Sequence, residues 1–261
     1  MTQLSGKKGV ILGIANDMSI AWHIAKACKD NGADMCLTYP NAMMKPRVTK
    51  LGEELEVKHY FECDVSKQES IESACEQIKS IYGEIDFIVH AVAFSDKNEL
   101  KGRYVDTSAA NFANTMNISC YSLTAISKHL SPILSKEGSI LTLSYYGAEK
   151  AIPNYNVMGV AKAALETSVK YLALDLGIDG IRVNAISAGP VRTLASAGIS
   201  DFRKMFNWSE KNSPLRRNIT DTDIGGAAVF LLSNASSGIT GEILHVDCGY
   251  NTVGMKLEDG E

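Results

Sequence analysis

Two residues seven positions apart, Tyr155 and Lys162, have side chains that could act together on one elongated ligand. A lysine can place a positive charge beside a reacting centre, and a phenol can donate a hydrogen bond to an oxygen that gains negative charge. A helix from about Asn154 to Gly177 would present both side chains on one face, about 10 Å apart along its axis. The same pair also fits a structural role, in which the tyrosine packs in the core and the lysine reaches solvent.

The elements that must position this pair follow from seven apolar, β-branched segments, which predict strands. Helical patterns of ten or more residues separate them. This alternation is typical of an α/β Rossmann-type fold, a doubly wound seven-stranded parallel sheet with helices on both faces. The predicted strands are 9–13, 35–39, 59–63, 87–91, 139–143, 182–186 and 242–246.

The turn after the first predicted strand is the place where such a sheet binds a phosphate. The familiar G-x-G-x-x-G pattern is missing, but Gly13 permits a tight turn. Ser19 can cap the next helix, whose free N–H groups, from Ile20 onward, attract an anion. A glycine before a capped helix also builds purely structural turns, so this turn by itself leaves both interpretations open.

The carboxyl ends of three other predicted strands also suit a dinucleotide. Asp64 and Val65 follow the third strand, where a carboxylate can bind the adenine amino group and a valine can pack on the ring; Asp64 fits a helix-capping turn almost equally well. Small residues at 91–93 leave room for a ribose, and 188–193 form a rigid turn. Together these ends favour a nicotinamide cofactor.

No linker rich in proline, glycine or serine interrupts the chain, so residues 1–261 are predicted to form a single dinucleotide-binding domain. The segment from Pro190 to Trp208 has no clear period. We therefore expect a mobile substrate-binding loop at about residues 191–210.

Bulk composition bears on the partners and the compartment. The net charge of -4 and the pI near 5.8 come without a basic stripe, which argues against nucleic acid as a partner. Six scattered cysteines without a C-x-x-C pair predict neither a metal site nor disulfides, and they favour a reducing compartment. No apolar stretch is long enough to span a membrane, so we expect a cytoplasmic protein with no membrane partner.

A resemblance decides between the catalytic and structural interpretations of the pair. The segments 144–149, 152–159, 161–162 and 182–190 closely resemble bacterial-type enoyl-acyl-carrier-protein reductases, which belong to the divergent short-chain dehydrogenase/reductases. Their Tyr-x6-Lys motif is specific. Ordinary short-chain dehydrogenases use Tyr-x3-Lys and would need a tyrosine where Met158 stands, which argues against a ketoacyl or steroid reductase. Loss of Tyr155 or Lys162 would have favoured a non-enzymatic, cofactor-sensing regulator.

The resemblance implies the last reductive step of fatty acid elongation in type II fatty acid biosynthesis. Hydride passes from the nicotinamide to the β-carbon of a trans-2-enoyl thioester on acyl carrier protein. Tyr155 would stabilise the enolate, Lys162 would hold the nicotinamide ribose, and Tyr145 would line the acyl pocket and assist protonation. Ser95 matches a backbone contact to the substrate. Because Pro40 stands where a basic residue would read a 2′-phosphate, NADH is favoured over NADPH.

The family's remaining properties are carried over as expectations. A homotetramer is implied, with the apolar helices near 119–134 and 155–176 as candidate interfaces. Arg203 and Lys204 could meet the acidic carrier protein or could belong to a solvated helix end. The implied cofactor contacts are Gly13, Ser19, Ile20, Asp64, Val65, Val92, Lys162, Val191, Arg192, Thr193, Leu194 and Ala195.

Overall fold

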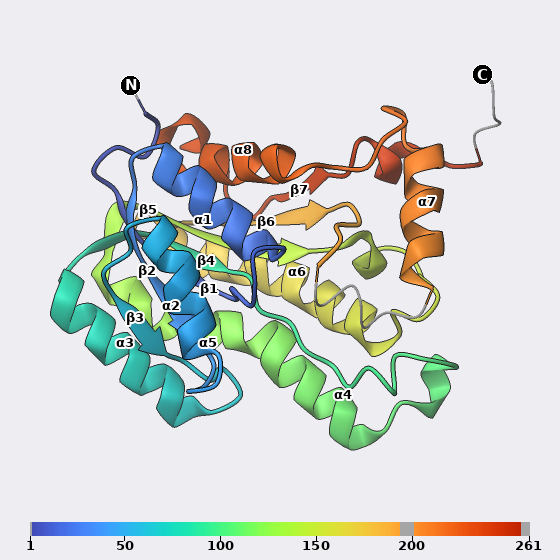
Figure 1. The fold of residues 1–261 in the computed structure, drawn as a ribbon, viewed down its shortest axis with the longest axis horizontal. Helices are drawn as coiled ribbons and strands as arrows, with labels where there is room; N and C mark the ends of the chain where they lie inside the picture. Colours follow the sequence, from blue (N-terminus) through green and yellow to red (C-terminus); the bar gives the residue numbers. More distant parts are fainter. Residues whose placement is uncertain (1, 194–200, 257–261) are drawn as a thin grey trace.

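The computed structural model describes residues 2–193 and 201–256, and these contain one seven-stranded parallel sheet (Figure 1). The strand order is β3-β2-β1-β4-β5-β6-β7, so the order reverses between β1 and β4. All seven predicted strands are confirmed. They are β1 Lys8–Leu12, β2 Asp34–Tyr39, β3 Tyr60–Glu62, β4 Ile85–His90, β5 Leu134–Ser144, β6 Arg182–Ala188 and β7 Ile243–Val246.

Helices cover both faces of the sheet, as the sequence predicts (Figure 1). One core cluster joins the sheet to α1 (Ile20–Asp30), α2 (Lys45–Glu54) and α8 (Asp221–Leu232). A second joins the other face to α3 (Gln68–Tyr82), α5 (Ser122–Leu130) and α6 (Val157–Gly177). The central strands β1 and β4 carry continuous apolar runs because both of their faces are buried. All seven residues of β6 are buried as well, although Arg182, Asn184 and Ser187 are polar.

The first strand-to-helix turn depends on Gly13. Its φ of +104° lies in a region that side chains rarely adopt. A Cβ built at this position would lie 2.1 Å from the carbonyl oxygen of Ala91, just beyond β4. Only glycine therefore lets this turn pack against the end of β4, at the point where the strand order reverses.

The start of α6 differs from the prediction. The helix begins at Val157 rather than near Asn154, and it ends at Gly177 as expected. Asn154 and Asn156 have φ values of +62° and +41°, and residues with positive φ cannot continue a right-handed helix. Tyr155 therefore lies in the turn before α6, and the prediction that it shares a helix face with Lys162 is wrong.

The predicted loop at about 191–210 is also wrong in its second half. Helix α7 runs from Phe202 to Asn212 and stands at one end of the molecule (Figure 1). Phe202, Met205 and Phe206 are partly buried at helical spacing, and the buried positions that continue this period are the polar residues Ser209 and Asn212. Residues 194–200 lie outside the described residues.

The connection from β4 to β5 contains a continuous helical segment. Helix α4 (Ala109–Met116) passes through a single π-helical stretch, η2 (Asn117–Tyr121), into α5. Such π-helical stretches occur often beside functional sites. Among the described helices, none has the length and apolar character required to cross a bilayer.

Candidate active site

Tyr145 and Tyr155 meet at the carboxyl end of β5. Their rings pack edge to face, with centroids 5.0 Å apart and planes at 71°. Tyr155 is 7% exposed, and its ring lies so close to Gly147 that a Cβ there would approach ring carbon Cδ1 to 2.4 Å. Burial raises the pKa of Tyr145 to about 12 and moves the pKa of Tyr155 further above its ordinary value. Both phenols are therefore neutral hydrogen-bond donors at physiological pH.

Lys162 is buried beside this pair rather than directed to solvent. Its side chain is 6% exposed, and its Nζ donates a 2.6 Å hydrogen bond to the carbonyl oxygen of Leu143, near the end of β5. Burial lowers the pKa of Lys162 to about 8. The interpretation in which this lysine reaches solvent is wrong. A buried ammonium with one acceptor retains further N–H donors for a ligand.

A buried polar group at the end of β4 could not be predicted from the sequence, because a single histidine and single hydroxyl residues give no pattern. His90 is fully buried at the end of β4, with its ring nitrogens 3.0 Å from Thr142 Oγ1 and 2.8 Å from Ser122 Oγ. Burial lowers the pKa of His90 to about 3, and the charge of Lys162 acts in the same direction, so the imidazole is neutral.

The phosphate turn after β1 uses Ser19 in a way that differs from the prediction. Ser19 occupies the N-cap position of α1, but its hydroxyl makes no cap hydrogen bond. Instead it accepts hydrogen bonds from the amides of Ala15 and Asn16, at 3.1 and 3.0 Å. The Ser19 hydroxyl therefore binds the backbone of the preceding turn instead of the first N–H groups of α1, and these two hydrogen bonds stabilise the turn. Ile20 then begins α1.

Asp64 makes the turn contacts of the structural interpretation. Its Oδ1 accepts hydrogen bonds from the amide and the hydroxyl of Ser66, at 3.1 and 2.6 Å, and Lys67 Nζ lies 3.0 Å from its Oδ2. Burial opposes ionisation, but these hydrogen bonds keep the pKa of Asp64 below its ordinary value. Val65 is buried in the core, and Val92, after β4, packs against the same cluster.

The segment after β4 is anchored to α4 and η2. Ser95 Oγ accepts hydrogen bonds from Thr115 and Asn111 at 2.9 and 3.2 Å. Ser119 Oγ accepts from the amide of Phe94 and donates to its carbonyl oxygen, both at 3.0 Å. The backbone at Ser95 is therefore held in place by side chains of the neighbouring helical segment.

The predicted contacts that follow β6 are only partly described. Val191 is partly buried and packs on the core, and the guanidinium of Arg192 lies 4.5 Å from the ring centroid of Phe206 on α7. Thr193 is partly buried. Leu194 and Ala195 lie outside the described residues.

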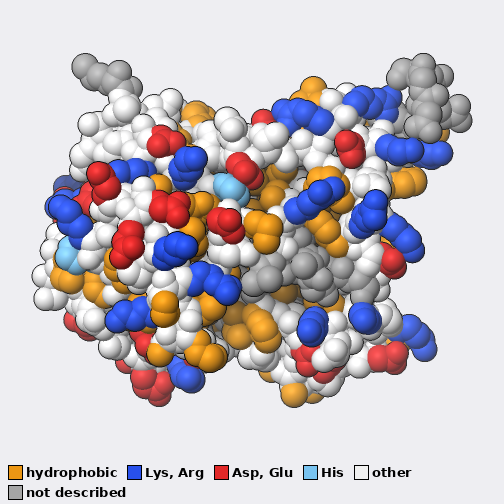
Figure 2. All heavy atoms as spheres, in the orientation of Figure 1, with side chains coloured by type: hydrophobic (Ala, Val, Ile, Leu, Met, Phe, Trp, Pro, Cys, Tyr) orange, Lys and Arg blue, Asp and Glu red, His pale blue; other side chains and the backbone are white. Residues whose placement is uncertain are grey.

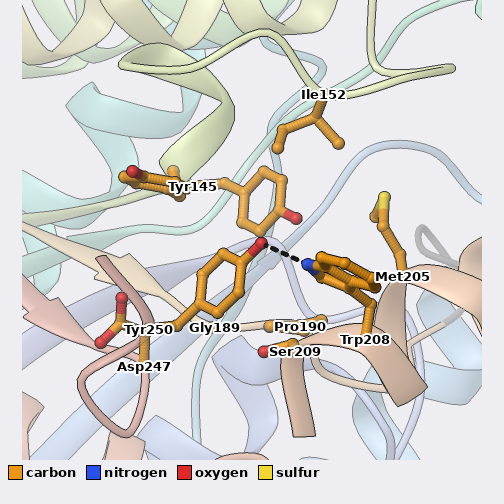
Figure 3. Close-up of a pocket in the computed structure, with 10 residues that line it drawn as sticks. Tyr145, Ile152, Gly189, Pro190, Met205, Trp208, Ser209, Asp247 and Tyr250 are labelled. Carbon is orange, nitrogen blue, oxygen red and sulfur yellow. Dashed lines mark hydrogen bonds between the residues drawn. The ribbon is translucent and has the colours of Figure 1, made fainter. Parts of the chain in front are cut away.

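A pocket lies between Tyr145, the turn after β6, and α7 (Figure 3). Trp208 closes one side, and its Nε1 donates a 3.1 Å hydrogen bond to the hydroxyl of Tyr250. The cavity volume is about 30 Å³. Its lining residues are Tyr145, Tyr146, Ile152, Gly189, Pro190, Met205, Trp208, Ser209, Asp247 and Tyr250.

The described residues contain no cluster of three or more His, Cys, Asp or Glu side chains that could hold a metal ion. The strand order, the glycine turn after β1, and a buried tyrosine and lysine at the carboxyl edge define a Rossmann-type oxidoreductase of the short-chain dehydrogenase class.

A family model narrows this class. The model described as "Enoyl-(Acyl carrier protein) reductase" matches residues 13–251, and the chain belongs to this family. A relative in Rhizobium meliloti (strain 1021), enoyl-[acyl-carrier-protein] reductase [NADH] 1, is 55% identical over 98% of this chain and 94% of its own length. A relative in Rickettsia typhi, with the same enzyme name, is 56% identical over 96% of each chain.

Solved structures share both the fold and the sequence. The enoyl-(acyl-carrier-protein) reductase from Anaplasma phagocytophilum, solved in complex with NAD, superposes with a TM-score of 0.95 at 61% identity and covers 98% of each chain. The enzyme from Candidatus Liberibacter asiaticus superposes with a TM-score of 0.96 at 47% identity, over 98% of this chain and all of its own.

Proposed function

We propose that Tyr155, Lys162 and Tyr145 carry the chemistry of this chain, which is an enoyl-[acyl-carrier-protein] reductase of fatty acid biosynthesis that uses NADH. The reaction reduces the 2,3 double bond of trans-2-enoyl thioesters on acyl carrier protein. The observation that carries the assignment of residues is the placement of a buried phenol (Tyr155), a partly buried phenol (Tyr145) and a buried lysine at the carboxyl edge of the sheet.

The residues present fit a nicotinamide dinucleotide. Gly13 has no side chain, and its backbone packs closely against Ala91. Helix α1 begins after this turn at Ile20, so its N-terminal N–H groups can bind a phosphate. Lys162 brings a buried cation with N–H donors to spare, which suits the hydroxyls of a ribose. When bound, NADH supplies the hydride that is transferred to the β-carbon of the enoyl group.

Tyr155 stabilises the negative charge that hydride addition creates. Addition at the β-carbon moves the electron pair of the double bond toward the thioester carbonyl, whose oxygen becomes an enolate oxygen. The raised pKa of Tyr155 keeps its proton in place, so the phenol donates a hydrogen bond to this oxygen. The nearby Lys162 ammonium adds a favourable charge in a water-poor site.

Tyr145 lines the acyl pocket and holds Tyr155 through their edge-to-face contact. Its pKa of about 12 makes it a hydrogen-bond donor that can assist protonation of the α-carbon. Ser95 is proposed to present its backbone to the substrate, in the segment that α4 and η2 anchor.

The other cofactor contacts are proposed at four strand ends. Oδ1 of Asp64 accepts hydrogen bonds within the turn, and Oδ2 contacts Lys67. We propose that Oδ2 accepts a further hydrogen bond from the adenine amino group. The full proposed set is Gly13, Ser19, Ile20, Asp64, Val65, Val92, Lys162, Val191, Arg192, Thr193, Leu194 and Ala195.

We propose a single domain over residues 1–261, because every described strand belongs to one sheet. The carrier protein is proposed to dock beside α7, where Lys and Arg side chains gather on the surface (Figure 2). Arg203 and Lys204 are exposed at the start of this helix, and positive charges there would attract an acidic partner. All six cysteines are free and buried, which supports a cytoplasmic location.

A homotetramer is proposed from exposed apolar side chains along α6. Val160, Tyr171 and Leu174 of α6 and Ile178, which directly follows it, recur at helical spacing, and Tyr171 and Leu174 are 67% and 75% exposed. Tyr121 of η2 adds a further exposed ring. A stripe of this kind is typical of an interface between subunits. Sedimentation equilibrium tests this: a monomer at micromolar concentration contradicts the proposal.

The reaction is tested by following the absorbance of the reduced nicotinamide with a crotonyl thioester. NADH is expected to be oxidised only when the enoyl thioester is present, and NADPH much more slowly. An acetoacetyl thioester is the control for a ketoacyl reductase. No enoyl-dependent oxidation of NADH would contradict the function, and faster oxidation with the ketoacyl substrate would favour the ordinary short-chain reductases.

A further inference from the structure

Two side chains of α6, one helical turn apart, bind consecutive residues at the end of β5. Lys162 Nζ donates to the carbonyl oxygen of Leu143, and Glu166 Oε1 accepts a 2.5 Å hydrogen bond from the hydroxyl of Ser144. Tyr145 is the next residue along the chain. Residues at i and i+4 lie on one face of a helix, so both contacts attach the end of β5 to the same face of α6.

The Glu166 carboxylate is linked electrostatically to both proposed catalytic groups. Burial lowers the pKa of Lys162, and the negative charge of Glu166 partly opposes this shift. Burial raises the pKa of Tyr155, and Glu166 adds to this shift. A negative Glu166 therefore favours the states that the reaction needs, a charged lysine and a protonated phenol.

Other charged groups face Glu166 from the elements around it. Burial raises its pKa, the hydrogen bond from Ser144 lowers it, Glu149 raises it, and both His245 and Lys170 lower it. Glu149 lies just after the proposed catalytic segment, and its Oε1 is 2.6 Å from Nε2 of His245 on β7. The segment after Ser144 is thus tied to α6 on one side and to β7 on the other.

We propose that Glu166 is a positioning residue for enoyl reduction, acting through Ser144 and Lys162. Its contact with Ser144 fixes the end of β5. The fixed strand end presents the Leu143 carbonyl oxygen to Lys162 and holds Tyr145 against Tyr155. This inference rests on the roles proposed for Tyr155 and Lys162, and it assigns a function to a glutamate that touches neither cofactor nor substrate.

A purely structural role for Glu166 makes different predictions. Loss of a stabilising hydrogen bond alone would lower the melting temperature and leave the pH profile in place. Loss of a positioning residue changes the environment of Lys162. Without the negative charge the pKa of Lys162 falls, so the loss of NADH affinity on the alkaline side begins at a lower pH than in the wild type.

The experiment compares Glu166→Gln and Ser144→Ala with two controls. Ser187→Ala is the matched control for Ser144→Ala, because Ser187 pairs with Ser144 on β6 and its buried hydroxyl has no hydrogen-bond partner among the described residues. Glu54→Gln is the control for the loss of a charge, because Glu54 is exposed at the end of α2 on the other face of the sheet. Melting curves establish that each variant is folded.

Both test variants are expected to lower kcat/KM with crotonyl thioester by up to about 10²-fold, the scale of a misplacement of about 1 Å. In Glu166→Gln, the alkaline limb of NADH affinity is also expected to move to lower pH, whereas both controls keep wild-type values. A wild-type pH profile in folded Glu166→Gln, or a wild-type kcat/KM in folded Ser144→Ala, would overturn the inference. If Glu166→Gln does not fold, kcat/KM of Ser144→Ala against Ser187→Ala decides. An inactive wild type would instead contradict the proposed function.

Discussion

The buried ammonium of Lys162 is held by the carbonyl oxygen of Leu143 at 2.6 Å, so a strand end and a helix share the positioning of one charge. The lysine has a pKa of about 8 because burial penalises its charged form. Burying a charged ammonium costs free energy, so its presence indicates a functional role. The nearby phenols and the glycine turn after β1 indicate that this role is in binding the dinucleotide and its substrate.

NADH affinity is predicted to fall as the pH rises above about 8, because Lys162 loses its charge there. Stability moves in the opposite direction. The folded pKa lies below the unfolded value of 10.5, so the unfolded state binds more protons between these values, and this group makes the protein more stable as the pH rises from about 8 to 10.5. Fluorescence titration with NADH from pH 6.5 to 9.5 measures the affinity.

Lys162→Ala is predicted to weaken NADH binding by about 10- to 100-fold, the scale of hydrogen bonds to a charged group. The variant should also lose the alkaline fall in affinity, since the group that titrates is gone. Lys162→Arg keeps a charge at all pH values and serves as the control. An unchanged dissociation constant for NADH in Lys162→Ala would show that this lysine does not hold the cofactor.

Tyr155→Phe is predicted to lower kcat by about 10²- to 10³-fold, as expected when a donor to a developing oxyanion is removed. The dissociation constant of NADH should change little, because the phenol is proposed to act on the substrate. Single-turnover oxidation of NADH with crotonyl thioester measures the step. Tyr146→Phe is the control, since this neighbouring tyrosine has no role in the proposed chemistry. Turnover at the wild-type rate would disprove the role of Tyr155.

Gly13→Ala is predicted to destabilise the protein by at least about 1 kcal/mol, because the new methyl group meets the Ala91 carbonyl oxygen at a positive φ. Displacement of the turn should weaken NADH binding as well. Gly83→Ala, also at a positive φ but with no atom within 4 Å of the added Cβ, separates backbone strain from the clash. Equal losses of NADH affinity in the two variants would contradict the argument.

The strands could be predicted from the sequence because burial on both faces leaves continuous apolar runs, as the buried residues at the end of β1 illustrate. Helix α7 was missed because its apolar period is short: after Phe202, Met205 and Phe206, the buried positions are the polar residues Ser209 and Asn212. The start of α6 was misplaced because asparagines with positive φ at 154 and 156 carry no distinctive signal in a sequence. In both cases tertiary contacts, rather than local pattern, determine the conformation.

Part of the candidate site could also be predicted from the sequence, and part could not. The spacing of Tyr155 and Lys162 pointed to the groups proposed to react, but it did not show that the tyrosine lies outside the helix. Ser19 and Asp64 were expected to face a ligand, and their hydroxyl and Oδ1 atoms instead bind the local backbone. Glu166 could have been suggested by its place one turn after Lys162. Its partner Ser144 could not, since their contact depends on how α6 packs on β5.

Trp208→Ala is predicted to shift substrate preference toward longer acyl chains. Trp208 and Tyr250 join across a pocket of about 30 Å³, so the indole occupies space that a longer chain would need. Removing it enlarges the pocket, and the ratio of kcat/KM for dodecenoyl over crotonyl thioester should rise. Tyr250→Phe removes only the hydrogen bond, worth about 0.5–1.5 kcal/mol, and should change the ratio far less. An unchanged ratio in Trp208→Ala would show that the acyl chain passes elsewhere.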